Sequence, residues 1–215
     1  MEPYPSLPLD TSASQLAIAG GTYFDSSAGV MGTGFVFRPT LTDGQTIQHI
    51  DIQGPPGWNS YTVYQLYPYQ PPRMATDRGI GWVFAEPISG VYTVTAEILR
   101  GQPVSTTFVI DTASQLAAPV ILNAAGSTSQ VTVDWSGTSE MHSFLLRLEQ
   151  EPFTSVITET MVPGEQRSLT FAGLSLKSGV LHRVVIFAFS NDLYTPGAVA
   201  SPAHLSAYVS ETFTP

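Results

Sequence analysis

The sequence predicts an all-β protein built from two tandem β-sandwiches. Short runs rich in β-branched and aromatic residues, each bounded by Gly or Pro, occur along the whole chain, whereas helical periodicity is hard to find. The pattern of runs restarts near the middle of the 215 residues. The pentapeptide Ala-Ser-Gln-Leu-Ala occurs at 13–17 and again at 113–117, one hundred positions later. A chain of this length accommodates two domains of about 100 residues.

The first half contains several clear strand candidates. They are Gly34–Pro39, Thr46–Ile52, Gly81–Ala85, Val91–Ala96 and Ser105–Ile110. In the last two, large apolar residues alternate with smaller or polar ones, as in a strand with one buried face. These runs predict a sandwich over residues 13–112. The Pro-rich segment before it, residues 1–12, is predicted to be an extended tether.

After the second copy of the pentapeptide the strand pattern starts again, with a turn signal every 8–12 residues or so. The strand candidates are Val120–Leu122, Gln130–Trp135, Ser143–Leu148, Ser155–Thr160, Ser168–Phe171, His182–Phe189 and Leu205–Val209. They predict a second sandwich over residues 120–215, of the immunoglobulin type. Residues 113–119 then form the linker and the start of the second domain. Each copy of the pentapeptide is expected just before the first strand of its domain.

The second half, about residues 118–210, resembles a fibronectin type III domain. That family places a tryptophan at the end of its second strand, a leucine in the loop before its sixth strand, and then an alternating tyrosine, valine, valine and alanine. The matching residues here are Trp135, Leu174, His182, Val184, Ile186 and Ala188. The sequence departs from the family where a histidine replaces the tyrosine and where the loop from Leu174 to His182 is longer than usual. The resemblance implies a fold and is nearly silent about function.

The first half resembles a more divergent immunoglobulin-like sandwich. The run Ser89–Ala96 is similar to the strand that carries the tyrosine corner in such domains, where a tyrosine hydroxyl bonds back to the upstream backbone. Val94 stands where an antibody domain has its second cysteine, and the chain contains no cysteine. The resemblance therefore implies a sandwich that packing alone holds together.

Charge and composition exclude several classes of partner. The net charge is −9 and Lys177 is the only lysine, so we expect neither nucleic acid nor an anionic membrane surface as a partner. No run of about 18 apolar residues predicts a transmembrane segment. The first residues have neither the basic region nor the apolar core of a signal peptide, which leaves open whether a leader preceded Met1. The expected location is extracytoplasmic, at a bacterial cell surface or in the periplasm, and a lipid anchor on a removed leader stays open.

No motif in the sequence predicts catalysis, a cofactor or a metal site. His49 and Asp51 share one face of a strand, but no third ligand is apparent, and a surface pair is the more common reading. The Gly-x-Ser-x-Gly motif of hydrolases is missing. The glycine-rich run Gly29–Gly34 lacks the lysine and the following helix of a phosphate loop. The protein is therefore not expected to be an enzyme.

The stretch from residue 54 to 74 is unusually rich in aromatic residues. It holds Trp58, Tyr61, Tyr64, Tyr67 and Tyr69 among five prolines. Such residues offer large, rigid contact area with a polar tip, which suits a platform for a polysaccharide or a protein. The alternative, which we favour, is that alternate tyrosines fill the core of the first domain while the prolines protect an edge strand.

One strand of the second half is apolar on both faces. Within 184–189, Val184, Ile186 and Ala188 are predicted to enter the sandwich core, whereas Val185, Phe187 and Phe189 need another cover. The first domain, a second copy of the chain or another protein would provide it. An error of one residue in the register would exchange the two faces.

These features predict a non-catalytic, extracytoplasmic protein of the cell envelope that acts in structural or adhesive protein–protein contacts. The alternative function is a carbohydrate-binding module that recognises cell-wall polysaccharide through the aromatic stretch 58–69. The expected partner is an envelope protein or a cell-wall glycan, and a homodimer stays open.

Overall fold

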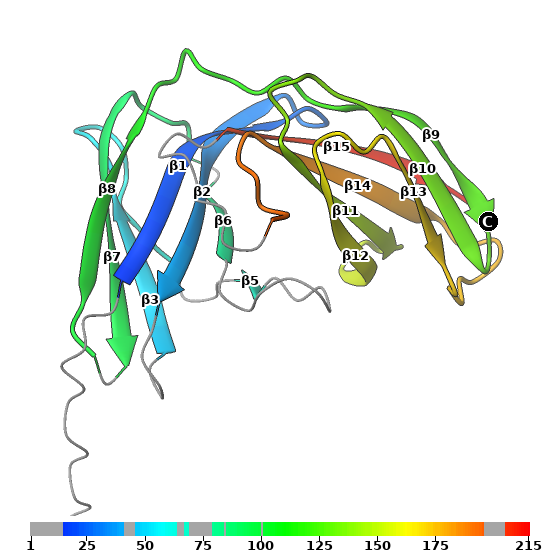
Figure 1. The fold of residues 1–215 in the computed structure, drawn as a ribbon, viewed down its shortest axis with the longest axis horizontal. Coiled ribbons are helices and arrows are strands. Elements are labelled where there is room, and N and C mark those ends of the chain that lie inside the picture. Colours follow the sequence, from blue (N-terminus) through cyan, green and yellow to red (C-terminus); the bar gives the residue numbers. More distant parts are fainter. Residues whose placement is uncertain are drawn as a thin grey trace, which may run out of the picture.

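The computed structural model describes residues 15–40, 46–63, 67–68, 79–83, 85–99, 101–195 and 205–215. Within these ranges the chain consists of strands and connecting turns, and no helix is present. The predicted all-β class is confirmed. Two β-sandwiches lie side by side in an arch, and one sheet runs through both (Figure 1).

The first sandwich has the strand order of an immunoglobulin-like domain. One layer has the order β1-β2-β6-β5 and the other has the order β4-β3-β7-β8. The strands are β1 (Gln15–Asp25), β2 (Val30–Thr40), β3 (Thr46–Gln53), β4 (Tyr61–Val63), β5 (Tyr67–Pro68), β6 (Gly79–Val83), β7 (Gly90–Leu99) and β8 (Val104–Ile110). Lettered from A to G, with C′ after C, these layers read A-B-E-D and C′-C-F-G, which is the immunoglobulin arrangement.

The second sandwich repeats this plan with one change. The strands are β9 (Val120–Ser127), β10 (Gln130–Ser136), β11 (Ser143–Gln150), β12 (Ser155–Pro163), β13 (Ser168–Ala172), β14 (His182–Phe189) and β15 (Ser206–Phe213). One layer has the order β13-β10-β9 and the other the order β12-β11-β14-β15. The layers read E-B-A and C′-C-F-G, so the D strand of the first sandwich has no counterpart and the E strand lies at an edge. This is a fibronectin type III-like sandwich.

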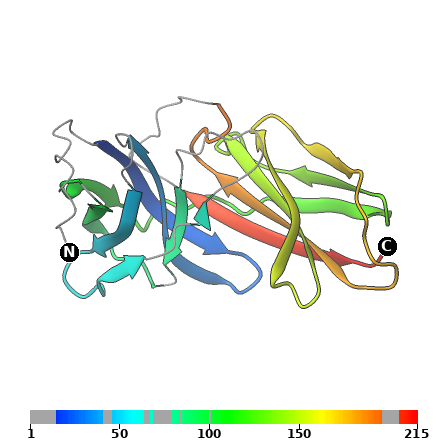
Figure 2. The ribbon, with the colours of Figure 1, turned by 90° about the horizontal axis from the view of Figure 1, so that it is seen from below.

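A parallel pairing between β1 and β15 joins the two sandwiches. The residue pairs are Tyr23 with Ser206, Phe24 with Ala207 and Asp25 with Tyr208. The backbone N–H and the hydroxyl of Ser26 both donate to the Tyr208 carbonyl, at 3.2 and 2.6 Å. The result is an eight-stranded sheet in which the last strand of the chain pairs with its first strand. Figure 2 shows the red β15, which begins beside the blue β1 at the boundary between the sandwiches and runs from there through the second sandwich.

Each sandwich has its own core. The first core contains Phe35, Ile50, Ile52, Trp58, Tyr92, Val94, Ala96, Phe108 and Ile110. The second core is built around Trp135, Phe144, Leu146, Leu148, Val184 and Ile186. Leu116, from the second copy of the pentapeptide, is 1% exposed and belongs to this second core. Ser114, also from that copy, accepts a hydrogen bond from the Thr22 hydroxyl on β1 at 2.9 Å, which ties the linker to the first sandwich.

The first copy of the pentapeptide differs from the prediction. It does not precede the first strand, because Gln15, Leu16 and Ala17 already belong to β1. The sequence pattern did not indicate β1 at all. This strand contains the adjacent glycines Gly20 and Gly21, which have low strand propensity and which weaken the alternating pattern.

A third apolar cluster lies at the junction of the sandwiches, and we call it the junction cluster. Its buried members are Tyr23, Val36, Leu145, Met161, Val185, Phe187, Phe189 and Leu193, with Tyr208 packed against them. Tyr23 and Val36 come from the first sandwich and the others from the second. Val184, Ile186 and Ala188 lie in the second core, so the predicted register of this strand is confirmed.

Candidate binding surfaces

A tight turn after β3 holds Trp58 against the first core. The Trp58 N–H donates to the Pro55 carbonyl at 3.0 Å. A Cβ on Gly54 would lie 2.5 Å from the Trp58 ring, so only glycine fits there. The indole packs edge-on against Tyr92, with 4.9 Å between ring centroids, and it is tilted against Tyr61 at 5.0 Å. These contacts fix the ring in place and leave the residue 7% exposed.

Trp58 and Tyr61 line one pocket of about 380 Å³ at the end of the first sandwich. Its walls come from two loops, residues 57–59 with Tyr61 on one side and residues 85–88 on the other. The buried indole Nε1 of Trp58 has no hydrogen-bond partner. Asn59 and Glu86 are exposed at the same pocket. The pocket therefore combines aromatic residues with an exposed carboxylate, whereas the Nε1 atom is buried and inaccessible to a ligand.

The predicted aromatic platform is thus divided between core and pocket. Trp58 belongs to the core and also lines the pocket, and Tyr61 is half-buried beside it. Tyr67 lies on β5 at the edge of the shared sheet, although its side chain is outside the described part. Tyr64 and Tyr69 lie outside the described residues. The described part accordingly presents no row of exposed aromatic rings.

Phe187 and Phe189 are buried within the chain itself, 6% and 0% exposed. Tyr208 packs against Phe187 with 5.3 Å between the ring centroids, and the Arg147 guanidinium lies 5.3 Å above the Phe187 ring. The sequence left open whether the first domain, a second copy of the chain or another protein covers these side chains. The first domain provides part of the cover, through Tyr23 and Val36. These phenylalanines therefore join the sandwiches and are not exposed to a partner.

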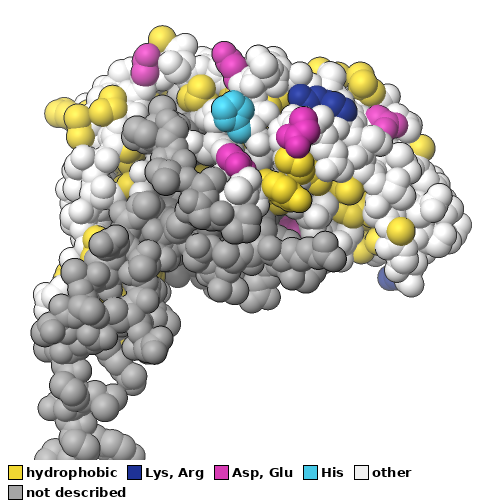
Figure 3. All heavy atoms as spheres, viewed as in Figure 1, with side chains coloured by type: hydrophobic (Ala, Val, Ile, Leu, Met, Phe, Trp, Pro, Cys, Tyr) yellow, Lys and Arg dark blue, Asp and Glu magenta, His cyan; other side chains and the backbone are white. Residues whose placement is uncertain are grey.

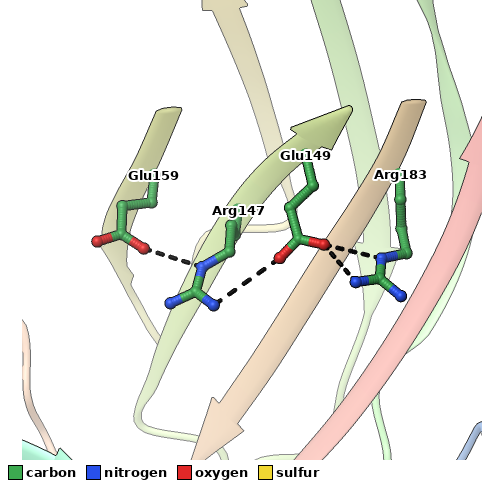
Figure 4. A network of polar contacts seen from close by, with 4 residues as sticks. All are labelled: Arg147, Glu149, Glu159 and Arg183. Carbon is green, nitrogen blue, oxygen red and sulfur yellow. Dashed lines mark hydrogen bonds and ion pairs between the residues drawn. The ribbon is translucent and has the colours of Figure 1, made fainter. Parts of the chain in front are cut away.

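A network of charged side chains lies on the same face of the sheet, beside the junction cluster (Figure 4). Arg147 Nε contacts a Glu159 oxygen at 3.0 Å, and Arg147 Nη1 lies 3.8 Å from Glu149. Arg183 Nε donates to the Glu149 carboxylate at 2.9 Å, and Arg183 Nη2 also donates to it. Glu149 is only 6% exposed, so the two guanidinium groups compensate the desolvation of its charge. Positive and negative groups balance, so the network favours neither cationic nor anionic ligands.

His49 and Asp51 form the surface pair that the sequence indicated. His49 Nε2 lies 3.4 Å from Asp51, and the Thr62 hydroxyl donates to the same carboxylate at 2.6 Å. Glu97 is the cross-strand neighbour of His49. Even so, no group of three His, Cys, Asp or Glu side chains in the described ranges has the geometry to hold a metal ion.

Two further pockets flank His142 at the end of the second sandwich, one of about 460 Å³ and one of about 490 Å³. The first contains Arg167, whose guanidinium donates to the Gln166 carbonyl at 2.7 Å and also to that of Gly164. The same group lies 5.1 Å above the Phe144 ring. Its cation is already engaged, and neither pocket is lined by a buried polar side chain without a partner, so these pockets do not point to a ligand.

Several large apolar side chains remain exposed on outer strands. Val91 and Val109 face each other across β7 and β8 and are 57% and 60% exposed. Leu122 on the edge strand β9 is 65% exposed, and Val156 and Ile157 are exposed on the edge strand β12. Figure 3 shows hydrophobic side chains in separate small groups among polar ones on one face of the arch. Such groups are candidate protein contacts.

Comparisons with known proteins do not identify a family. No family model matches the chain, and no curated protein matches it either. Among solved structures, the chain is similar to the FN1–FN3 domains of chicken CNTN1, with 11% sequence identity and a TM-score of 0.31. The match covers 92% of this chain and 66% of that structure. In the described part, no helix is long and apolar enough to cross a membrane.

Proposed function

We propose that this protein is a non-catalytic module of the cell envelope that makes structural or adhesive protein–protein contacts. The observation that carries the proposal is the eight-stranded sheet shared by both sandwiches. Tandem domains on a flexible linker move independently unless their interface is large and apolar. Here a strand pairing, the junction cluster and the bond from Thr22 to the linker fix one domain on the other. Two sandwiches held side by side in one fixed arrangement suit a spacer or a scaffold.

The exposed apolar pairs supply the second line of support. Binding energy in protein interfaces comes mainly from a few apolar or aromatic anchors with a polar rim around them. Val91 with Val109 has this setting, because the same face of β7 and β8 carries Thr93, Thr95, Ser105 and Thr107. Leu122 on the edge strand β9 is exposed together with Val120. The net charge of −9 favours a partner surface with basic residues. A second copy of the chain remains an alternative occupant of these surfaces.

Site-specific photo-crosslinking tests this proposal. A photoreactive residue at Val109 or Leu122 should give one saturable protein adduct on cells of the source organism. The same residue at Glu165 or Lys177, exposed positions away from these strands, is the control and should give little adduct. Protein adducts of equal yield at all four positions, or none at any of them, would contradict the proposal. An adduct of twice the chain mass would identify a homodimer as the contact.

We further propose an extracytoplasmic location, at a bacterial cell surface or in the periplasm, with a lipid anchor as one route of attachment. The support is the β-sandwich fold, which many cell-surface modules share. Protease accessibility of intact cells and spheroplasts checks it. Recovery of the protein only in the cytoplasmic fraction would contradict this location.

Carbohydrate binding is the second candidate function. One observation favours it, namely that Trp58 and Tyr61 line the same pocket. A glycan array and a cell-wall pull-down test it, with loss of binding in Trp58→Ala as the expected result. The burial of the indole counts against it, because stacking on a sugar ring needs an exposed aromatic face.

A further inference from the structure

We infer that the free edge of strand β8 is a self-association surface, at which a second copy of the chain pairs its own β8 in antiparallel orientation. This inference rests on the proposed function and deepens it, because it names the partner at Val109. β8 is the last strand of the sheet β4-β3-β7-β8, and in the described part it pairs with β7 alone. A free strand edge presents unpaired backbone N–H and C=O groups that can pair with another chain.

β8 lacks the features that usually protect a sheet edge from such pairing. Proteins protect edges with very short strands, charged side chains, prolines or bulges. The seven residues of β8 read Val-Ser-Thr-Thr-Phe-Val-Ile and include no charged residue, proline or glycine. Their register with Gly90–Ala96 of β7 runs without a bulge, and Val109 on the outer face is 60% exposed. The edge is therefore regular, partly apolar and unprotected.

The other edge strands of the described part each differ from β8 in this respect. β4 and β5 contain only three and two residues. β12 contains Glu159 and Pro163, whereas β9 contains Gly126 and lies beside a bulge in its ladder with β10. β13 has five residues and exposes no large apolar side chain. Strand addition is thus expected at β8 before any of these.

The lack of charge at this edge selects the occupant. Neither β8 nor the segment Gly90–Ala96 that pairs with it contains a charged residue. A basic partner therefore finds no carboxylate on these paired segments, whereas an identical uncharged strand meets no like-charge repulsion there. A second copy of the chain brings such a strand, and dimers with two-fold symmetry are the commonest oligomers.

The sequence of β8 defines one register for this pairing. Side chains directly opposite each other in an antiparallel pair lie on the same face, so the register has to place core-facing residues opposite core-facing ones. Among the registers that do so, only the one centred on Thr107 pairs all seven residues. Val104 then lies opposite Ile110, and Thr106 opposite Phe108, on the core side. The two-fold axis passes through Thr107.

This register also matches the outer faces of the two copies. Thr107 is the cross-strand neighbour of Thr93 on β7, so the dimer has a central row of four threonines, two from each copy. Cross-strand Thr–Thr pairs are favourable. The single chain already has a hydroxyl contact of this kind on the same face, with Thr95 and Ser105 oxygens 2.7 Å apart. Two four-stranded sheets would thereby form one continuous sheet, as β1 and β15 join two layers within the chain.

Sedimentation equilibrium of the full chain tests the inference. The protein should form dimers and no larger species, because the pairing uses up the β8 edge of both copies. A single strand pairing is a small interface, so we expect a dissociation constant of about 100 µM. Raising NaCl from about 20 to about 300 mM should strengthen the dimer, because salt screens the repulsion between two chains of net charge −9.

Substitutions at the two-fold axis provide the sharpest test. Thr107→Lys places two like charges directly opposite each other and should weaken the dimer at least about tenfold. Thr107→Glu should do the same, whereas an equimolar mixture of the two variants should form heterodimers. Thr170→Lys, the same change at an exposed position of the edge strand β13, is the matched control and should leave the dimer unchanged.

A cysteine variant tests the register without introducing a charge, and it remains informative if the charged variants do not fold. The chain contains no cysteine, so Thr107→Cys introduces a single thiol. Opposite residues of an antiparallel pair are close enough for a disulfide, so oxidised glutathione should convert this variant to a covalent dimer. Thr170→Cys should stay monomeric on a non-reducing gel.

Four results would overturn the inference. They are a monomer at about 1 mM, a dimer that Thr107→Lys leaves intact, a mixture of the two charged variants that stays monomeric, and a dimer that salt weakens. A monomer in solution together with a protein adduct of another mass at Val109 would overturn the homodimer alone and retain the proposed function. A dimer in solution without any protein adduct on cells would contradict the proposed function and retain the homodimer.

Discussion

The two sandwiches carry different residues at one equivalent position of the F strand, Tyr92 on β7 and His182 on β14. In the first, the Tyr92 hydroxyl donates to the Ile88 carbonyl at 2.9 Å and accepts from the Ile88 N–H at 3.0 Å, which is the predicted tyrosine corner. In the second, His182 Nδ1 lies 2.8 Å from the Val180 carbonyl. Each stands opposite a phenylalanine of the last strand of its sandwich, Phe108 or Phe213. The histidine therefore keeps a hydrogen bond to the upstream backbone, but its partner lies two residues away in the sequence, whereas the partner of Tyr92 lies four residues away.

Tyr92→Phe should destabilise the protein by about 1 kcal/mol, since it removes two hydrogen bonds of one hydroxyl and keeps the ring in the core. Urea denaturation followed by circular dichroism measures this. Tyr194→Phe, at an exposed position, is the control and should change stability little. Equal midpoints for both variants would show that the corner contributes nothing measurable.

Tyr23 gives the molecule a predictable response to alkaline pH. Burial raises its pKa above the ordinary value of 10.0, with smaller contributions from Asp25 and Tyr208. Because the folded pKa is the higher one, the contribution of Tyr23 to stability is fully present below pH 10. Above this value the unfolded chain loses the proton first, so stability falls by up to about 1.4 kcal/mol per pH unit. Tyr23→Phe should make the fall between pH 10 and 11 less steep in urea titrations, and an unchanged slope would contradict this.

At the scale of elements, β1 shows why small residues matter in a strand that packs on both sides. A Cβ on Gly20 would lie 1.9 Å from a ring atom of Phe108, in the first core. Further along the same strand, β1 reaches the second sandwich, where Phe24 packs against the second core. Glycine thus lets one strand approach the layer opposite it closely.

Gly20→Ala should destabilise the protein by about 3 kcal/mol, because either the Phe108 ring or the strand has to shift. Gly29→Ala provides the contrast. It has a φ of 65° and open space around it, so its cost is limited to backbone strain of about 1 kcal/mol. Thermal and urea unfolding should rank the two variants in this order, and the reverse order would show that the core adapts easily to the added methyl group.

The sequence predicted those elements whose pattern is local. The alternation in β7, and the two apolar faces of β14, can be read from consecutive residues, and the structure has both. β1 could not be predicted, because Gly20 is required by its contact with Phe108, which is distant in sequence. The pocket at Trp58 could be predicted from the sequence only in part. The aromatic residues were visible, but Glu86 and Ile88 come from a loop whose proximity only the fold reveals.

At the scale of the whole molecule, the order of the strands decides how the two domains behave. The A strand of the first sandwich, β1, and the G strand of the second, β15, would each be an exposed sheet edge. They pair with each other, so neither edge is exposed along the paired segment. An exposed strand edge is thereby removed, and the unit gains a fixed shape. Unfolding of either sandwich uncovers part of the junction cluster, so we expect the two to unfold together.

Calorimetry of the wild type should therefore show a single transition, and Tyr23→Ser with Phe24→Ser should split it. These residues lie on opposite faces of the segment of β1 that pairs with β15. Tyr23 belongs to the junction cluster and Phe24 packs against the second core. Each of the two lost apolar contacts is worth about 2 kcal/mol. Their sum is comparable to the free energy with which a short strand pairing holds the sandwiches together.

The separated domains would then be connected only by the linker, and small-angle scattering should show a larger radius of gyration. Val30→Ser, in the same hairpin but 45% exposed, is the matched control and should retain the single transition and the compact shape. If the double variant kept one transition and an unchanged radius, the sheet pairing alone would hold the sandwiches. If it lost both folds at once, the β1–β2 hairpin would be part of a single folding unit and the division into two sandwiches would have no thermodynamic meaning.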